Sequence, residues 1–196
     1  MKQHHGHRIV VAPIGSIQPS WLDAIEDAVT RIFDFSISVQ PMLEDISFAF
    51  DPERGQYNST TILNRLAVLL PETAVRILAI TDVDLFIPIL TYVYGEAQLG
   101  GVAAILSVHR LTQDPLRPDS DRIVLTRIAK EAIHEIGHTF HLKHCPDHTC
   151  IMHYCRGIRD VDNKNDQLCR YCRIFLSDAL KQMATRFPHS SVHHRG

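Results

Sequence analysis

The sequence predicts an α/β fold, and three observations lead to that prediction. Short β-branched or apolar runs alternate with amphipathic helical patterns in the first half of the 196-residue chain. The longest helical pattern follows, from Arg122 to roughly His141, and an irregular segment and a final helix complete the chain. The length suits one domain over residues 1–196, with an N-terminal part (1–141) and a C-terminal part (142–196).

Two strands and a helix are expected first. Arg8–Pro13 is a short β-branched run and predicts a strand. Ser20–Phe33 predicts a helix, because its apolar residues share one face and Ser20 can cap its N-terminus. Phe35–Gln40 alternates in polarity as a second strand does. Asp51–Ser59 is polar, contains proline and glycine, and predicts a loop.

A helix and two strands follow. Thr60–Leu70 predicts a helix that Pro71 ends. Val75–Ile80 is a largely apolar run and predicts a buried strand. Tyr92–Gly101 ends in paired glycines and predicts a loop or turn. Val102–Val108 predicts a further strand, either at an edge of the sheet or in its interior.

The second half begins with the long helix, from Arg122 to roughly His141, which Asp119 or Ser120 can cap. Leu142–Gln167 has little periodicity and is expected to be irregular. Leu168–Phe187 predicts the final helix.

Composition excludes several classes of protein. The formal net charge is −2, so no basic field indicates binding to nucleic acid or to an anionic membrane. No run approaches the roughly 20 apolar residues that span a bilayer. The polar start Met1–His7 and the short apolar run Ile9–Pro13 do not resemble a signal peptide. We therefore expect a cytoplasmic protein, and a monomer, without a nucleic-acid or membrane partner.

The long helix carries a metal-binding pattern. His134 and His138 are four residues apart, which puts both imidazoles on one face of a helix, about one turn apart. Glu135 lies beside them and is placed to act on a metal-activated water rather than as a ligand. Surface histidines on an amphipathic helix are the alternative. Further ligand-type residues follow directly, so the pattern favours a zinc site.

Two downstream histidines are candidates for the third ligand. His144 is six residues after His138, in the pattern H-E-x-x-H-x-x-x-x-x-H. His141 would share the helical face of the first two, and three ligands on one straight helix would splay too widely for tetrahedral zinc. The spacing therefore favours His144.

Four of the five cysteines form two close pairs. Cys145 and Cys150 are separated by four residues, and Cys169 and Cys172 form a C-x-x-C pair. Two pairs split by a loop are typical of a structural zinc site, which would tie the irregular segment to the last helix. Buried or unpaired thiols are one alternative, and a redox C-x-x-C pair is another. Cys155 is either a simple buried thiol or a replacement for one of the four.

These residues together resemble the archaemetzincins, a family of metzincin-clan zinc peptidases. The likeness rests on the run from His134 to Met152, which is H-E-x-x-H-x5-H-C-x4-C-x-M, and on the C-x-x-C pair that follows. Thr81–Phe86, Gly95–Ala97 and the strand leading to Arg110–Leu111 are similar to that family's central blocks. The likeness covers roughly residues 55 to 172.

The resemblance implies two Zn²⁺ ions per chain. A catalytic zinc would be bound by His134, His138 and His144, with Glu135 as general base and acid. A structural zinc would be bound by Cys145, Cys150, Cys169 and Cys172. The implied fold is a metzincin-like twisted mixed sheet with an active-site helix, a cleft below the sheet's edge strand and a small zinc-braced C-terminal part. Met152 would lie in a tight turn beneath the catalytic zinc.

Other positions have more than one interpretation. In some other metzincins, a tyrosine at the offset of Tyr154 lies near the zinc and stabilises an oxyanion; packing under the turn is the interpretation favoured here. Val102–Val108 is a candidate edge to which an extended peptide can add, or an interior strand. Asp82 and Asp84 end a buried strand, where a structural role is favoured over catalysis.

His141 departs from the family pattern, which has glycine at this position. The position serves a sharp turn, expected to have φ > 0, where a Cβ is unfavourable. Histidine enters the left-handed region more readily than most residues, so the turn can form at some strain. The departure removes neither a ligand nor the base.

The sequence therefore predicts a zinc metallopeptidase that acts on a peptide or protein substrate, through zinc-activated water and with Glu135 as general base. The alternative is a catalytically silent zinc-binding protein that binds peptides or partners.

Overall fold

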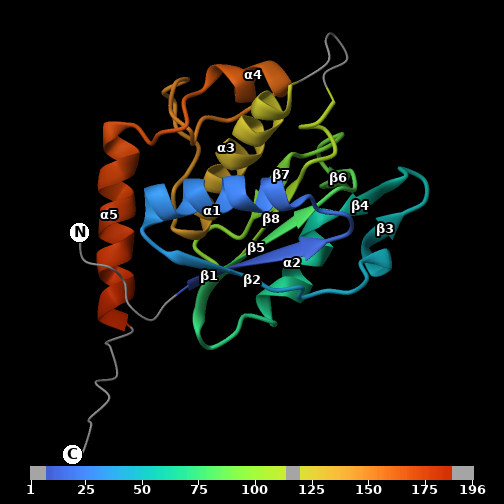
Figure 1. The fold of residues 1–196 in the computed structure, drawn as a ribbon, viewed down its shortest axis with the longest axis horizontal. Coiled ribbons are helices and arrows are strands. Elements are labelled where there is room, and N and C mark those ends of the chain that lie inside the picture. Colours follow the sequence, from blue (N-terminus) through green and yellow to red (C-terminus); the bar gives the residue numbers. More distant parts are fainter. Residues whose placement is uncertain (1–7, 114–119, 187–196) are drawn as a thin grey trace, which may run out of the picture.

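Strands and helices alternate along the chain in the computed structural model, which describes residues 8–113 and 120–186 (Figure 1). The first half contains β1 (Arg8–Ile14), α1 (Pro19–Phe33), β2 (Ser36–Val39), η1 (Ser47–Ala49), β3 (Phe50–Asp51), β4 (Gln56–Asn58), α2 (Ser59–Ala67) and β5 (Ala74–Thr81). The second half contains β6 (Leu85–Phe86), β7 (Gly95–Ala97), β8 (Ala103–Ser107), α3 (Asp121–Thr139), α4 (Ile158–Asn163) and α5 (Arg170–Arg186). The α/β prediction is confirmed.

The main sheet has five strands in the order β2-β1-β5-β8-β7. Strands β2, β1, β5 and β8 run parallel, and β7 pairs antiparallel with β8 at one edge. A smaller sheet of order β3-β4-β6 lies beside it. The sheet is thus mixed, as the resemblance implies, and its antiparallel edge strand is very short.

Both faces of the main sheet are covered. Helices α1 and α3 pack on one face and α2 on the other (Figure 1). Along β1, Ile9 and Val11 join the core under α1 and α3, while Val10 and Ala12 join the core over α2. A strand that is buried on both faces requires apolar residues at every position, which explains the continuous apolar run.

The edge of the sheet differs from one interpretation of the sequence. Val102–Val108 was a candidate edge strand, but β8 lies between β5 and β7 and is buried along its whole length. The edge is β7, which falls within the stretch Tyr92–Gly101 that predicted a loop or turn. This strand has only three residues, and all three are partly buried. Its sequence is therefore too short to show the alternation of polar and apolar residues that predicts a strand.

Helix starts also differ from prediction. Gln18 rather than Ser20 is the N-cap of α1, because Pro19 occupies the first turn, where its missing N–H costs nothing. Ser120 is the N-cap of α3, although its side chain makes no capping bond, and Asp119 lies outside the described residues.

The polar stretch Asp51–Ser59 is more ordered than a loop. It contains β4, and Ser59 already begins α2. The Asn58 side chain caps that helix by accepting a hydrogen bond from the Thr61 N–H at 2.9 Å.

Helix α3 is tied to the irregular C-terminal part by buried charges. Arg127 donates twice to the Asp162 carboxylate, at 2.7 and 2.8 Å. Lys130 donates to the carbonyls of Val161 and Asp162 near the end of α4. The short helix α4 was not expected from the sequence, and these bonds fix it against α3. None of the helices in the described ranges has the length and hydropathy to cross a bilayer.

Candidate metal centres and cleft

Two histidines project from the last turns of α3. His134 Nδ1 lies 2.9 Å from the Ile151 carbonyl oxygen, and His138 Nδ1 lies 2.6 Å from that of Leu142. A carbonyl oxygen can only accept, so each Nδ1 carries a proton. Each Nε2 of the neutral rings is therefore left with a lone pair, which is the form that binds a metal.

The two Nε2 atoms face each other at 3.1 Å. Two lone pairs at that separation repel, unless a cation lies between them. Two ligands at about 2.0–2.1 Å from one tetrahedral zinc would lie about 3.3 Å apart. The separation therefore fits a shared metal better than a hydrogen bond between the rings.

Burial keeps these imidazoles neutral. It lowers the pKa of His134 well below its usual value and that of His138 to about 4. His144 is more exposed, and burial lowers its pKa also. Neutral imidazoles near pH 7 are ready to bind a divalent cation without first losing a proton.

The chain turns sharply after α3 and brings His144 back to the other two histidines. Phe140 is the C-cap, and His141 follows it in the left-handed region with φ 65°. The His141 N–H donates to the His138 carbonyl and the Leu142 N–H to that of Gly137. This is the Schellman arrangement, so the expectation of a positive φ at His141 is confirmed.

The ligand atoms of His134, His138 and His144 all lie within 4.8 Å of one another. His141 is directed elsewhere: its imidazole packs over Gly100, where a Cβ would collide with the ring. The Gly100 N–H also donates to the His138 carbonyl. Of the two candidates for the third position, His144 is the one that the structure places with the others.

Met152 packs directly beneath this group. Its side chain is fully buried, and a Cβ on Gly137 would lie 2.6 Å from its sulfur. Gly137 thus lets the thioether lie against the helix between His134 and His138. The Met152 carbonyl accepts from the Cys145 N–H at 2.9 Å, which links this turn to the segment that carries His144.

Glu135 lies between the histidines and the edge strand β7. A Cβ on Gly95 would be only 2.6 Å from both Cγ and Oε1 of Glu135, so the carboxylate packs against bare main chain. The residue is 5% exposed. Burial, and then the nearby carboxylate of Glu131, raise the pKa of Glu135 well above its usual value. A raised pKa makes this carboxylate a stronger base.

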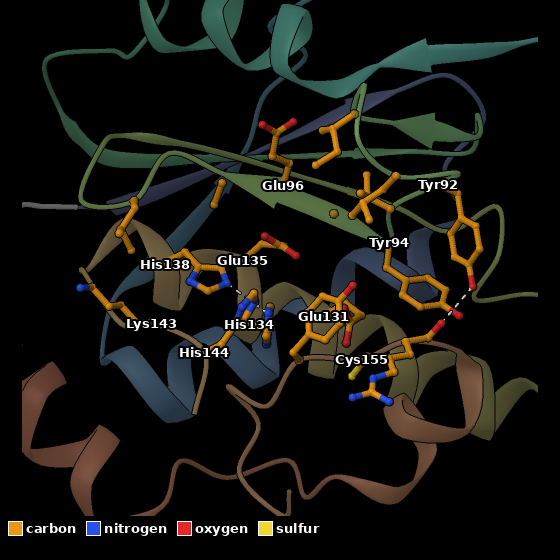
Figure 2. A pocket seen from close by; sticks show the side chains of 18 of the residues that line it. Tyr92, Tyr94, Glu96, Glu131, His134, Glu135, His138, Lys143, His144 and Cys155 are labelled. Atoms are coloured by element: carbon orange, nitrogen blue, oxygen red, sulfur yellow. Dashed lines mark hydrogen bonds between the residues drawn. The ribbon is translucent and has the colours of Figure 1, made fainter. Parts of the chain in front are cut away.

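A cleft of about 700 Å³ runs past these residues, below β7 (Figure 2). The three histidines and Glu135 line it near Lys143, and Tyr92, Tyr94 and Cys155 lie toward its other end. Its remaining lining includes Leu99, Glu131 and Tyr154. A cleft below the edge strand is what the resemblance implies.

Tyr154 lies on the wall of this cleft. It is 41% exposed, and its ring centroid lies 5.2 Å from that of His144. The favoured interpretation, packing under the turn, is therefore wrong.

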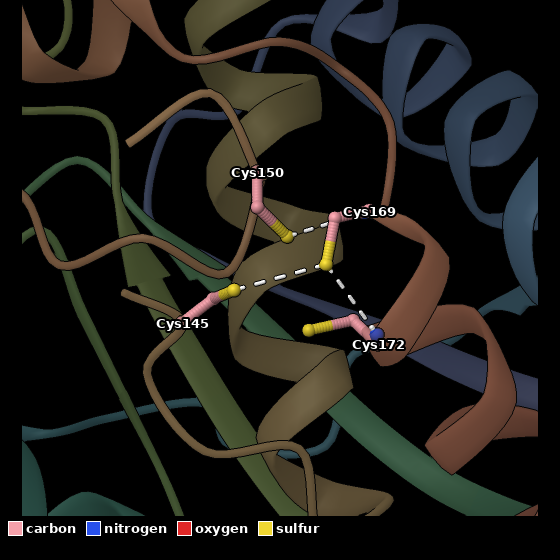
Figure 3. Close-up of side chains that lie close together, drawn as sticks. All are labelled: Cys145, Cys150, Cys169 and Cys172. Carbon is pink, nitrogen blue, oxygen red and sulfur yellow. Dashed lines mark hydrogen bonds between the residues drawn. The ribbon is translucent and has the colours of Figure 1, made fainter. Parts of the chain in front are cut away.

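The second group consists of four cysteines (Figure 3). The Sγ atoms of Cys145, Cys150, Cys169 and Cys172 all lie within 4.8 Å of one another. Cys145 Sγ and Cys169 Sγ are 3.8 Å apart, and no disulfide forms between these cysteines. The Cys169 N–H points to Cys150 Sγ at 3.3 Å and the Cys172 N–H to Cys169 Sγ at 3.5 Å. Backbone donors to sulfur favour thiolates, the form that binds zinc.

Cys155 is outside the four-cysteine group. Its Sγ lies 3.6 Å from the His153 carbonyl, and it lines the cleft. Burial raises its pKa to about 11. It is therefore a partly buried thiol, one of the two alternatives that the sequence allows.

Several cleft residues were not predicted from the sequence. Glu131 forms a buried ion pair with Lys164 at 2.7 Å, one helical turn before Glu135. The available signal for Glu131 was its helical spacing, since it lies four residues before Glu135 and seven before His138, on the same side of α3. Tyr92 and Tyr94 stand in a stretch without periodicity and gave none.

A histidine group beside a buried carboxylate, in a cleft under an edge strand, is the arrangement of zinc-dependent peptidases. Comparison with known proteins gives the family. The model of peptidase family M54 matches residues 42–178. The chain belongs to this family, and it is accordingly a zinc metallopeptidase, a hydrolase of peptides.

Named relatives are similar in sequence over most of this chain. An archaemetzincin of Archaeoglobus fulgidus is 36% identical over 165 residues, which cover 84% of this chain and 96% of that protein. One of Methanocaldococcus jannaschii is 35% identical over 173 residues, covering 87% and 93%. The crystal structure of archaemetzincin from Methanopyrus kandleri superposes with a TM-score of 0.78 at 32% identity, covering 91% of this chain and 98% of that one. The predicted resemblance is confirmed.

Proposed function

We propose that this protein hydrolyses peptide bonds at a catalytic zinc bound by His134, His138 and His144, with Glu135 as general base. The observation that carries the proposal is the 3.1 Å separation of the His134 and His138 Nε2 atoms. Both rings are held in that orientation by main-chain carbonyls, at 2.9 and 2.6 Å. The third histidine completes a ligand set with an open side toward the cleft.

We also propose a second, structural zinc at Cys145, Cys150, Cys169 and Cys172. Four thiolates close around the ion and leave no position for a substrate. This site joins the turn after His144 to the start of α5. It therefore braces the segment that carries the third histidine.

Glu135, β7 and Tyr154 each have a defined task in this proposal. A zinc ion held by the three histidines would act as a Lewis acid, which would polarise the substrate carbonyl and lower the pKa of water. Glu135 accepts the proton of the attacking water and returns it to the leaving amine, and its raised pKa suits both steps. An extended substrate adds to β7, whose far side is not paired within the main sheet. Tyr154, whose ring centroid lies 5.2 Å from that of His144, would donate to the oxyanion.

The test begins with zinc per chain in protein without a tag. We expect two zinc ions in the native protein and one in His134→Ala/His138→Ala. One zinc in both proteins would mean that only the cysteine site fills, and the proposed catalytic site would be wrong. Cys150→Ser/Cys172→Ser serves as the reciprocal control and should lose the other zinc.

The general base is tested separately. Glu135→Gln should retain both zinc ions and lose hydrolysis of a peptide mixture by at least about 10²-fold. Equal background activity in the native protein and the variant would support the alternative, a catalytically silent zinc-binding protein. The single-domain organisation, the monomeric state and the cytoplasmic location stay predictions.

A further inference from the structure

One end of the cleft is closed by the side chain of Tyr92 (Figure 2). The residue precedes β7 and reaches toward the segment after Met152, where its hydroxyl donates to the Arg156 carbonyl at 3.5 Å. Its ring packs edge-on against that of Tyr94, with centroids 5.5 Å apart. Tyr92 thus connects the upper wall of the cleft to the lower wall, and Glu131 lies between it and the histidines.

Tyr92 is held from outside the cleft by a charged pair. The Arg110 guanidinium carbon lies 4.0 Å from the centre of the Tyr92 ring, in a cation–π contact. Arg110 in turn donates twice to the Asp84 carboxylate, through Nε and Nη2, both at 2.7 Å. This two-point bond fixes the plane of the guanidinium and, with it, the position of the ring.

The same carboxylate also holds the main chain beside Tyr92. Gln56 Nε2 lies 2.8 Å from Asp84 Oδ2 and 3.0 Å from the Thr91 carbonyl, and can donate to both. The Val93 N–H donates to the Leu85 carbonyl at 2.9 Å. The main chain is therefore held at Thr91 and at Val93, on either side of Tyr92. Neither residue belongs to the candidate metal-binding groups.

Space continues behind this barrier. A second hollow of about 590 Å³ is lined by Gln56, Asp84 and Arg110, and Thr91 lines both it and the cleft. The Tyr92 ring and its arginine therefore stand between two hollows. Removing the ring would lengthen the cleft toward the second hollow.

We propose that Tyr92 limits the size of the substrate side chain that enters the cleft beside the histidines, and that Arg110 and Asp84 position it. This inference rests on the proposed function, because it assumes that a peptide lies along β7. Alternate side chains of such a peptide point into the cleft. One of them would enter the space over Glu131, pass Tyr94 and meet the Tyr92 ring at its end.

The test uses zinc-loaded protein and three peptide hydroxamates that differ in one side chain: methyl, benzyl and biphenylmethyl. Binding is measured by calorimetry, so no turnover is needed. We expect Tyr92→Ala to improve the affinity for the biphenylmethyl probe, relative to the methyl probe, by about tenfold or more. Tyr92→Phe keeps the ring and should leave that ratio within about twofold of the native value.

Separate variants test whether Arg110 positions Tyr92. Arg110→Gln should also raise the affinity for the biphenylmethyl probe relative to the methyl probe, by a smaller factor than Tyr92→Ala. In the double variant it should add little to the effect of Tyr92→Ala, because both substitutions act through the Tyr92 ring. Tyr171→Ala and Arg65→Gln are the matched controls. Tyr171 is an exposed tyrosine on α5, and Arg65 stacks on Phe48, which does not line the cleft. Neither control should change the ratio.

The outcomes separate this inference from the proposed function. An unchanged ratio in Tyr92→Ala, with native zinc content and melting temperature, would overturn the inference even if the native protein hydrolyses peptides. A shifted ratio without hydrolysis by the native protein would support the inference and contradict the proposed function. Failure of the zinc-loaded native protein to bind any of the probes would overturn both.

Discussion

The Glu135 carboxylate lies against the main chain of Gly95, at a distance that leaves no room for a side chain there. A Cβ on Gly95 would be 2.6 Å from Oε1 of Glu135. The strand that would receive a substrate is therefore the strand that positions the proposed base. One glycine thus couples substrate alignment to the location of the carboxylate.

Gly95→Ala should displace Glu135 without touching the metal ligands. We expect zinc content to stay native and kcat to fall by about 10²-fold, because a shift of about 1 Å at a catalytic group has that effect. The measurement is peptide hydrolysis together with zinc per chain. Gly157→Ala is the control, since a Cβ there meets nothing within 4 Å. If Gly95→Ala kept the native kcat, the close contact with Gly95 would not be what positions Glu135.

Substitution of His141 tests the turn after α3. Its φ of 65° suits glycine, so His141→Gly should not lower the free energy of unfolding and should keep both zinc ions. His141→Val should lower the free energy by about 1–3 kcal/mol, because a β-branched residue is strained in the left-handed region. Denaturant unfolding of zinc-loaded protein measures both. Equal stability of the two variants would contradict the account of the turn.

Loss of Lys164 should be strongly destabilising. Its side chain is fully buried and pairs with Glu131, whose side chain is 4% exposed. Lys164→Met leaves a buried carboxylate without its cation, and we expect a loss of about 3–5 kcal/mol. Lys181→Met breaks an exposed pair with Asp178 and should cost less than about 1 kcal/mol. Glu131→Leu/Lys164→Met should recover much of the loss, and a further loss would count against a paired role.

Acid should destabilise the zinc-free protein through His138. Its pKa is about 4 in the folded chain and about 6.5 when unfolded, so the unfolded chain binds the proton first as pH falls. The free energy of unfolding should therefore be unaffected by this group above pH 6.5 and fall by up to about 3 kcal/mol between pH 6.5 and 4. Denaturant unfolding of the zinc-free protein at a series of pH values measures this. His138→Gln should flatten that slope, and an identical slope in the variant would refute the assignment.

Local spacing explains what could be predicted. The i, i+4 relation of His134 and His138 depends only on helical periodicity, so the sequence revealed it. The two cysteine pairs were visible for the same reason, since the members of each pair lie within a few residues of each other. The turn at His141 was expected from the resemblance, because the family has glycine at this position. Largely apolar runs such as β5 were predicted because a strand that is buried on both faces carries few polar residues, here Arg76 and Thr81.

Long-range pairing explains what could not be predicted. The short strand β7 has no periodicity of its own and is an edge only because it pairs with β8. Tyr154 was expected beneath the turn and lies on the cleft wall. The turn before it is held by long-range contacts, from His134 to the Ile151 carbonyl and from the Cys145 N–H to the Met152 carbonyl.

The sequence by itself determined the family, the α/β class and the two candidate sets of metal-ligand residues, because these follow from residue type and short-range spacing. Only the tertiary structure decided which strand borders the cleft, how Gly95 places Glu135, and that Tyr92 and Arg110 close one end. Those features join residues that are distant along the chain, and their positions follow from packing rather than from any local pattern.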